Sequence, residues 1–185
     1  MEAVQTYRWT REAFEKLAEV GLIDPDARLE LIDGEILQKM SPQSSRRAAA
    51  IRRIEETLRR LFPLDRYDVR VQLPLALGPY SEPEPDVAVV EGTIDDYVEA
   101  HPSTAVLVVE VADASLQFDR TRKAALYARA GIPDYWIVNL LDGVLEVHRQ
   151  PEGDAYRERL VLPSQERVRP LARPEVEIAV AELLP

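Results

Sequence analysis

Two short apolar runs, each with a carboxylate at one end, constrain the fold of this chain most strongly. The run 86–90 reads Asp-Val-Ala-Val-Val and the run 105–110 reads Ala-Val-Leu-Val-Val-Glu. Continuous β-branched runs of this length are typical of strands that are buried on both faces. A helical pattern over about 119–130 then ends at Gly131, and Tyr135–Val138 reads as another strand. A strand, a helix and a strand in this order predict a crossover connection in a mixed sheet.

The other segments add helices and hairpins. Apolar spacing predicts one helix from Thr10 to about Val20 and another from Ser44 or Ser45 to about Leu61. Asp-Gly pairs at 33–34 and 142–143 predict two-residue hairpin turns. Further strands are expected over 67–77 with a break or an edge at Pro74, over 144–148, over 156–162, and in 176–184 before a last helical turn. We therefore expect an α/β fold: a mixed β-sheet flanked by helices, with β-hairpins.

Composition limits the class of protein. A chain of 185 residues with 46% apolar and 30% charged residues predicts one globular domain, 1–185. It contains no cysteine, so disulfides, thiolate metal sites and cysteine nucleophiles are excluded. No run of eighteen apolar residues and no basic-then-apolar leader is present, so no membrane partner is expected and the cytoplasm is the default location.

The charge is unevenly distributed along the chain. A net charge of −10 argues against a general nucleic-acid binder. Residues 71–118, however, contain nine acidic and no basic residues, and they include both strand carboxylates. The helix predicted after Ser44 is basic instead, and DNA phosphates are candidate partners for four of its arginines: Arg46, Arg47, Arg52 and Arg53. A solvated helix face is the simpler interpretation of these arginines.

The two strand carboxylates predict a metal site. A carboxylate on a buried strand must have its charge stabilised, and a divalent cation is one of the few groups that can do this. We expect Asp86 and Glu110 to share Mg²⁺ (or Mn²⁺), with the carbonyl of Val111 as a neutral ligand. Lys123 follows on the predicted helix and is one of only three lysines, so we expect its ammonium group to point between the two acids. Such a site suits hydrolysis of an anionic ester such as a phosphodiester.

Each candidate has a structural alternative. Asp86 could cap a strand, Glu110 could be a satisfied structural acid, and Lys123 could face solvent. Asp119 and Gln72 are auxiliary candidates, but an N-cap for Asp119 and an ordinary strand position for Gln72 are favoured. Tyr127 lies four residues after Lys123, hence on the same helix face, and is expected to pack beside it.

The ordered motifs of the chain resemble those of a known family. They are Glu30-Leu-Ile-Asp-Gly-Glu35, Pro85-Asp86, Val108-Val-Glu-Val111, Asp119-Arg-x-x-Lys123 with Tyr127, and Gly131-Ile-Pro-Asp-Tyr-Trp-Ile-Val138. Together they resemble, over about residues 5 to 160, the Uma2-like family, described as putative restriction endonucleases of the PD-(D/E)xK superfamily. The resemblance implies a restriction-endonuclease-like core, a Mg²⁺-dependent DNA endonuclease activity, and catalytic roles for Asp86, Glu110 and Lys123. Glu30 matches an accessory acid that precedes the core, although an ordinary position on the hairpin surface is its alternative.

Two positions depart from the family pattern. The superfamily lysine lies two residues after the second acid, where this chain has Ala112, so the resemblance implies that the lysine has migrated to Lys123. Members often carry a histidine near the start of the second helix, where this chain reads Ser45-Arg46-Arg47. Arg47 and the acidic net charge favour one alternative function, a weak or inactive nuclease fold that serves as a binding or assembly module. A homodimer is a further open expectation.

Overall fold

A six-stranded mixed sheet forms the centre of the protein. The computed structural model describes residues 6–24, 26–39 and 44–185. The strands lie side by side in the order of the chain: β3 (Tyr67–Val71), β4 (Val87–Glu91), β5 (Leu107–Ala112), β6 (Asp134–Asn139), β7 (Val144–Glu152) and β8 (Ala155–Pro163). All neighbours are antiparallel except β5 and β6, which are parallel. The mixed α/β fold and the crossover predicted from the sequence are confirmed.

The crossover helix differs from the prediction at its start. It begins with α3 (Leu116–Phe118), continues through a π-helical segment η2 (Asp119–Lys123) and ends as α4 (Ala124–Arg129). The prediction that Asp119 caps this helix is therefore wrong. Asp119 has helical backbone angles, φ −67° and ψ −38°, and its buried carboxylate accepts a hydrogen bond from the Ser115 hydroxyl at 2.6 Å. A side chain held inside the helix in this way cannot cap the helix start.

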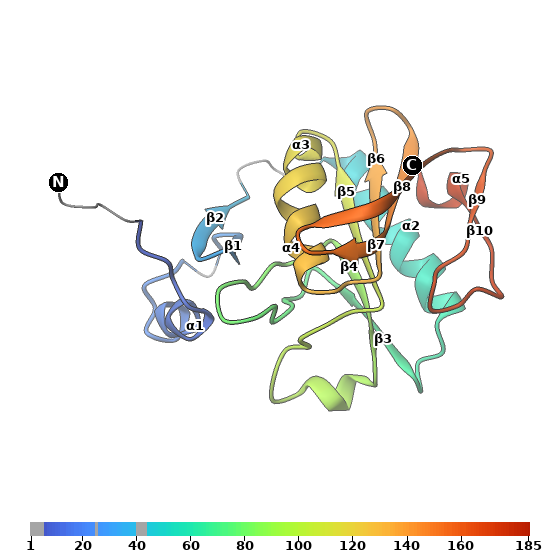
Figure 1. Cartoon of the computed structure of the whole chain (residues 1–185). Coiled ribbons are helices and arrows are strands. Elements are labelled where there is room, and N and C mark those ends of the chain that lie inside the picture. The colour runs from blue at the N-terminus through green and yellow to red at the C-terminus, as the bar shows by residue number, and fades with distance from the viewer. Residues whose placement is uncertain (1–5, 25, 40–43) are drawn as a thin grey trace.

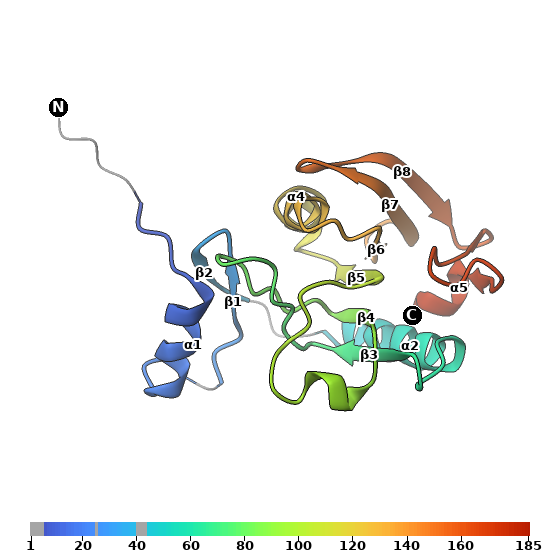
Figure 2. The same ribbon diagram turned by 60° about the horizontal axis from the view of Figure 1, so that its bottom comes forward.

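Helices cover both faces of the sheet (Figure 2). On one face, Ile51, Ile54 and Leu58 of α2 (Ser45–Leu61) pack in the same apolar cluster as alternate residues of β4 and β5. On the other face, Tyr127 of α4 packs with the residues that alternate with them, among which is Val108. Because both faces are covered, β5 and β6 are buried along their whole length. This burial accounts for their continuous apolar sequence.

The N-terminal segment forms a separate layer at one side of the sheet (Figure 1). It contains α1 (Arg11–Glu19) and a hairpin of β1 (Leu29–Ile32) and β2 (Glu35–Gln38). Asp33 and Gly34 at its turn both have positive φ, 54° and 85°, as the Asp-Gly prediction requires. The hairpin joins the loop before β4 through two backbone hydrogen bonds between Leu31 and Glu82, of 2.7 and 3.2 Å.

The remaining elements are short. They are η1 (Ile94–Tyr97), β9 (Arg167–Val168), β10 (Ile178–Ala179) and α5 (Val180–Leu183). The strand expected over 67–77 is shorter than predicted, because Gln72 has a positive φ of 50° directly after β3. None of the helices in the described part of the chain is both long and apolar enough to span a membrane.

Glu146 on β7 ties the crossover helix to the sheet. Its buried carboxylate accepts hydrogen bonds from Arg120 of η2, from Arg159 of β8 at 2.7 Å and from Asn139 of β6 at 3.0 Å. Burial opposes ionisation, but the nearby His148 ring, the hydrogen bonds from Arg120 and Asn139, and the charge of Arg159 outweigh it and hold the pKa of Glu146 well below its usual range. Arg120 lies three residues before Lys123, so Glu146 also fixes the segment that carries this lysine.

We expect Glu146→Gln to lower the free energy of unfolding at neutral pH by about 1–3 kcal/mol, because two arginines lose their counter-charge and both are partly solvated. The lowered pKa means that the native protein gains stability above the unfolded-state pKa of the carboxyl group and loses it as the pH falls. Urea unfolding from neutral to acidic pH should therefore show a shallower acid loss in the variant. Glu55→Gln, at an exposed helix pair with Arg59, is the control and should change little.

Candidate active site

The register of the central strands brings the two predicted acids together. Val87 lies opposite Val109 and Ala88 opposite Val108, so one further step places Asp86 beside Glu110 on the same face. The Asp86 backbone N–H donates to Glu110 Oε2 at 3.4 Å, and the Val111 N–H donates to Asp86 Oδ2 at 2.8 Å. Both acids are buried, with exposed fractions of 0% and 2%.

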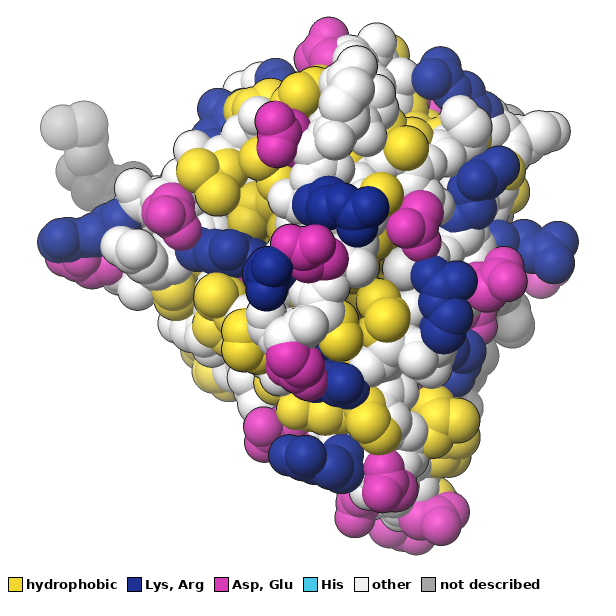
Figure 3. Space-filling view, turned by 90° about the vertical axis from the view of Figure 1, so that its right-hand side faces the viewer, with side chains coloured by type: hydrophobic (Ala, Val, Ile, Leu, Met, Phe, Trp, Pro, Cys, Tyr) yellow, Lys and Arg dark blue, Asp and Glu magenta, His cyan; other side chains and the backbone are white. Residues whose placement is uncertain are grey.

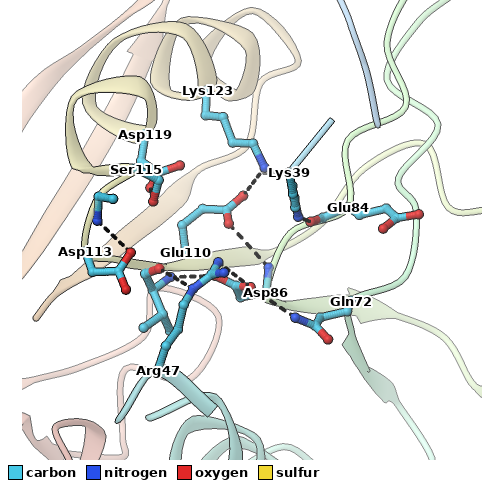
Figure 4. A network of polar contacts seen from close by, with 12 residues as sticks. Lys39, Arg47, Gln72, Glu84, Asp86, Glu110, Asp113, Ser115, Asp119 and Lys123 are labelled. Carbon is cyan, nitrogen blue, oxygen red and sulfur yellow. Dashed lines mark hydrogen bonds and ion pairs between the residues drawn. The ribbon is translucent and has the colours of Figure 1, made fainter. Parts of the chain in front are cut away.

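The crossover helix brings Lys123 to this pair (Figure 4). Its ammonium group lies 2.8 Å from Glu110 Oε1, the oxygen opposite to the one that Asp86 contacts. The Tyr127 hydroxyl, one helical turn further on, donates to the same Oε1 at 2.8 Å. The lysine is therefore buried and turned toward Glu110 as expected, but it lies on the far side of that carboxylate from Asp86. The solvent-facing alternative is wrong.

The N-terminal hairpin supplies a third acid and a second lysine. Glu30 of β1 lies 2.9 Å from the Lys123 ammonium group and accepts the Glu84 backbone N–H at 3.2 Å. With an exposed fraction of 3%, it is not a surface hairpin residue. Lys39, which the sequence analysis did not single out, donates to the Glu84 carbonyl at 2.8 Å and lies 4.0 Å from Glu30. The scarcity of lysine was the available signal, because two of the three lysines lie at this site.

Arg47 reaches Asp86 from the opposite layer. It lies in the first turn of α2, and its guanidinium group passes the end of the strands (Figure 4). Its Nη2 contacts both carboxylate oxygens of Asp86, at 2.9 and 2.7 Å, and its Nε donates to the Val111 carbonyl at 3.0 Å. Arg46, Arg52 and Arg53 of the same helix are instead exposed. Gln72 contributes a longer contact to Asp86, at 3.4 Å.

The electrostatics follow from this crowding of buried charge. Burial alone would lower the pKa of Lys123, but Glu110, Glu30 and Asp119 raise it above its usual value. Burial raises the pKa of Glu110; Lys123 opposes the rise and Asp86 adds to it. Burial and the charge of Glu110 also raise the pKa of Asp119, to about 7. Burial is thus the largest cause of both raised pKa values, and the neighbouring acids add to it.

A cavity of about 360 Å³ opens beside the charged groups. Its lining includes Glu30, Arg47, Glu110, Asp119 and Lys123, together with apolar side chains such as Phe118. The charged residues of the lining thus face one space, whereas Asp86 lies outside the lining and is reached through Arg47.

The donor set suits a hard divalent cation in its chemistry. Asp86, Glu110 and the Val111 carbonyl provide carboxylate and backbone oxygens, which Mg²⁺ and Mn²⁺ prefer. The guanidinium group of Arg47 already binds two of these three donors, which shows that the position attracts a cation. Within the described residues, no group of three or more His, Cys, Asp and Glu side chains forms a metal site. A metal here would depend on a backbone oxygen and on water for its further ligands.

Comparison with known proteins agrees with this fold. A solved structure described as "a putative nuclease belonging to DUF820 from Anabaena variabilis" superimposes with a TM-score of 0.74 and 17% sequence identity, covering 94% of this chain and 96% of that chain. The likeness shows that the two chains share a fold. The sequence model of the Uma2 family, described as "Putative restriction endonuclease", matches residues 11–181. The chain belongs to the Uma2 family, as its motifs indicated. No match was found among curated proteins.

Removing the buried lysine should destabilise the protein strongly. We expect Lys123→Met to lower the free energy of unfolding at neutral pH by about 3–5 kcal/mol, because it leaves two buried carboxylates without their shared cation. The loss should shrink at mildly acidic pH, where these carboxyls take up protons. Urea unfolding measures both effects. Lys16→Met, at a lysine whose side chain is 69% exposed, is the matched control, and equal losses in the two variants would contradict the assignment.

Proposed function

We propose that the protein is a metal-dependent endonuclease that hydrolyses DNA phosphodiester bonds at the cluster of Asp86, Glu110 and Lys123. The observation that carries the proposal is the pairing of two buried acids beside a lysine that faces a cavity. The membership of the chain in the Uma2 family supports the same reaction. Asp86, Glu110 and the Val111 carbonyl would hold Mg²⁺ or Mn²⁺. The bound metal would supply Lewis-acid chemistry, which activates water and stabilises charge on the phosphate.

The side chains of the chain itself perform the remaining tasks. Tyr127 and Lys123 fix the orientation of Glu110 through Oε1, which leaves Oε2 directed toward Asp86. Lys123 keeps its proton, because three acids raise its pKa, and thus holds a permanent positive charge beside the cavity. A compact ammonium group in a buried setting stabilises negative charge that grows on a phosphate during cleavage. Glu30 holds the lysine from the hairpin side.

If Lys123 acts on the reacting phosphate, its loss should lower the rate of DNA cleavage without weakening Mn²⁺ binding. We expect Asp86→Asn and Glu110→Gln to abolish Mn²⁺-supported cleavage of plasmid DNA. Lys123→Met should bind Mn²⁺ no more weakly than the parent yet cleave about 10²-fold more slowly, because the lost contact acts on the transition state. Circular dichroism at the assay temperature checks that each variant is folded. Parental rates in Lys123→Met would contradict the role given to the migrated lysine.

The exposed arginines of α2 are the proposed DNA contacts. Arg46, Arg52 and Arg53 lie on the helix whose first turn enters the site. The face that carries the C-terminal segment offers no comparable surface, because basic and acidic side chains alternate there (Figure 3). Ion pairs such as Arg60–Glu182, at 2.9 Å, and Arg169–Glu177, at 2.5 Å, neutralise basic groups of the α2 end and the C-terminal segment.

Replacing Arg46, Arg52 and Arg53 by Gln should weaken DNA binding without changing Mn²⁺ affinity. If each contacts one phosphate, the slope of log K against log salt should fall by about 0.9 for each arginine lost. Fluorescence anisotropy with a labelled duplex at several salt concentrations measures this slope. Arg167→Gln, at an exposed arginine of β9, serves as the control. An unchanged slope in the triple variant would place the DNA elsewhere.

One observation favours a second function. Arg47 supplies Asp86 with a counter-charge of its own, so the fold can satisfy this acid without metal. An inactive nuclease fold that acts as a binding or assembly module would have this property. Failure of the protein to bind Mn²⁺ in isothermal titration calorimetry, both as the parent and after Arg47 is replaced, would favour this function over the nuclease.

A further inference from the structure

Arg47 contacts oxygens that the proposed metal would use. Of the three oxygen donors assigned to the cation, its Nη2 contacts both oxygens of Asp86 and its Nε contacts the Val111 carbonyl. The third donor, Glu110, is engaged separately by Lys123 and Tyr127. A metal ion bound to these oxygens would lie close to the positively charged guanidinium group, and the two cations would repel each other. The two cations would therefore compete for Asp86 and the Val111 carbonyl.

The contacts of Arg47 are strong enough to matter for metal affinity. Its side chain is 13% exposed and its partner Asp86 is fully buried, so solvent screens the pair little. Nη2 of Arg47 contacts both Asp86 oxygens, and Nε contacts the Val111 carbonyl. These hydrogen bonds are charge-assisted, and together they fix the orientation of the guanidinium group. The backbone N–H of Val111 satisfies Asp86 further, so the acid has partners on every side without metal.

Displacement of Arg47 has a route within the structure. The side chain forms part of the wall of the 360 Å³ cavity, while its backbone lies in the first turn of α2. Because the side chain already borders the cavity, we expect rotation of the side chain to move the guanidinium group from Asp86 toward the cavity. There it would lie beside the space where an anionic substrate is proposed to bind.

We propose that Arg47 is an internal cation that competes with the divalent metal for Asp86 and the Val111 carbonyl, and so sets the metal affinity of the site. The inference rests on the proposed metal-dependent function. It adds that the apo site is held together by this arginine, and that metal binds only as the arginine withdraws. Arg47 is therefore an affinity-determining residue rather than a catalytic one.

Variants at position 47 test the competition. We expect Arg47→Gln to bind Mn²⁺ at least about tenfold more tightly than the parent in isothermal titration calorimetry, because a buried ion pair no longer has to be broken. Arg47→Lys keeps the charge but cannot contact Asp86 and Val111 together, and should fall between the two. Lys39→Gln controls for loss of charge alone, because Lys39 also lines the cavity but contacts neither Asp86 nor Val111. It should tighten binding less than Arg47→Gln does.

A measurement on the parent protein tests the proposal even if the variants at position 47 do not fold. In ¹⁵N-resolved NMR spectra, the buried Nε–H of Arg47 should give a signal protected from solvent exchange, identified by its absence in Arg47→Lys. Titration with Mg²⁺ should remove this protection while the Nε–H of Arg149, which contacts the buried Asp134, keeps its own. Persistence of the Arg47 signal at saturating Mg²⁺ would overturn the proposal, as would equal Mn²⁺ affinities in Arg47→Gln and the parent.

The outcomes separate this inference from the proposed function. Tighter Mn²⁺ binding in Arg47→Gln without DNA cleavage by any variant would support the competition and contradict the nuclease. Equal Mn²⁺ affinities together with Mn²⁺-supported cleavage would contradict the competition and support the nuclease. Absence of Mn²⁺ binding in the parent and in every variant would contradict both.

Discussion

The structure depends on one physical constraint, the need to keep carboxylates charged or satisfied inside the protein. Glu110 lies in the middle of a strand that is buried on both faces, where an unpaired charge would cost several kcal/mol. The chain meets this cost with groups from separate elements: Lys123 and Tyr127 from the crossover helix, and Asp86 through its backbone from β4. The lysine then needs Glu30 from the hairpin. Each layer of the fold is thus linked to the site through a buried charge.

The crossover helix shows how packing and charge act together. Tyr127 belongs to the apolar cluster on its face of the sheet, yet its hydroxyl donates to Glu110. Arg120 donates a hydrogen bond to Glu146 of β7, while Lys123 points inward to Glu110. Arg120 and Lys123 both belong to the π-helical segment. π-Helical turns are frequent at functional sites, and this one contains the lysine that we propose to act in the reaction.

Local patterns in the sequence were sufficient to predict the strands and the pairing of two acids. The runs at 86–90 and 105–110 are apolar because both faces of their strands are covered, and a one-step extension of their register joins Asp86 to Glu110. The contacts of the hairpin and the interior of the crossover helix were not predictable. Nothing local shows that Glu30 is buried, that Lys39 approaches Glu84, or that Asp119 lies inside its helix, because these outcomes depend on how the hairpin and the crossover pack.

Arg47 shows most clearly what sequence patterns leave open. Arg46 and Arg47 are adjacent in the basic start of the predicted helix, and both were candidates for phosphate contact. The structure turns Arg46 to solvent and Arg47 to Asp86, because the first turn of α2 lies at the ends of β4 and β5. A histidine at this place would have a shorter side chain and would carry little charge at neutral pH. An arginine is always charged and reaches further, so it can complete the acid site by itself. Arg47 thus gives the buried Asp86 a cation from within the chain.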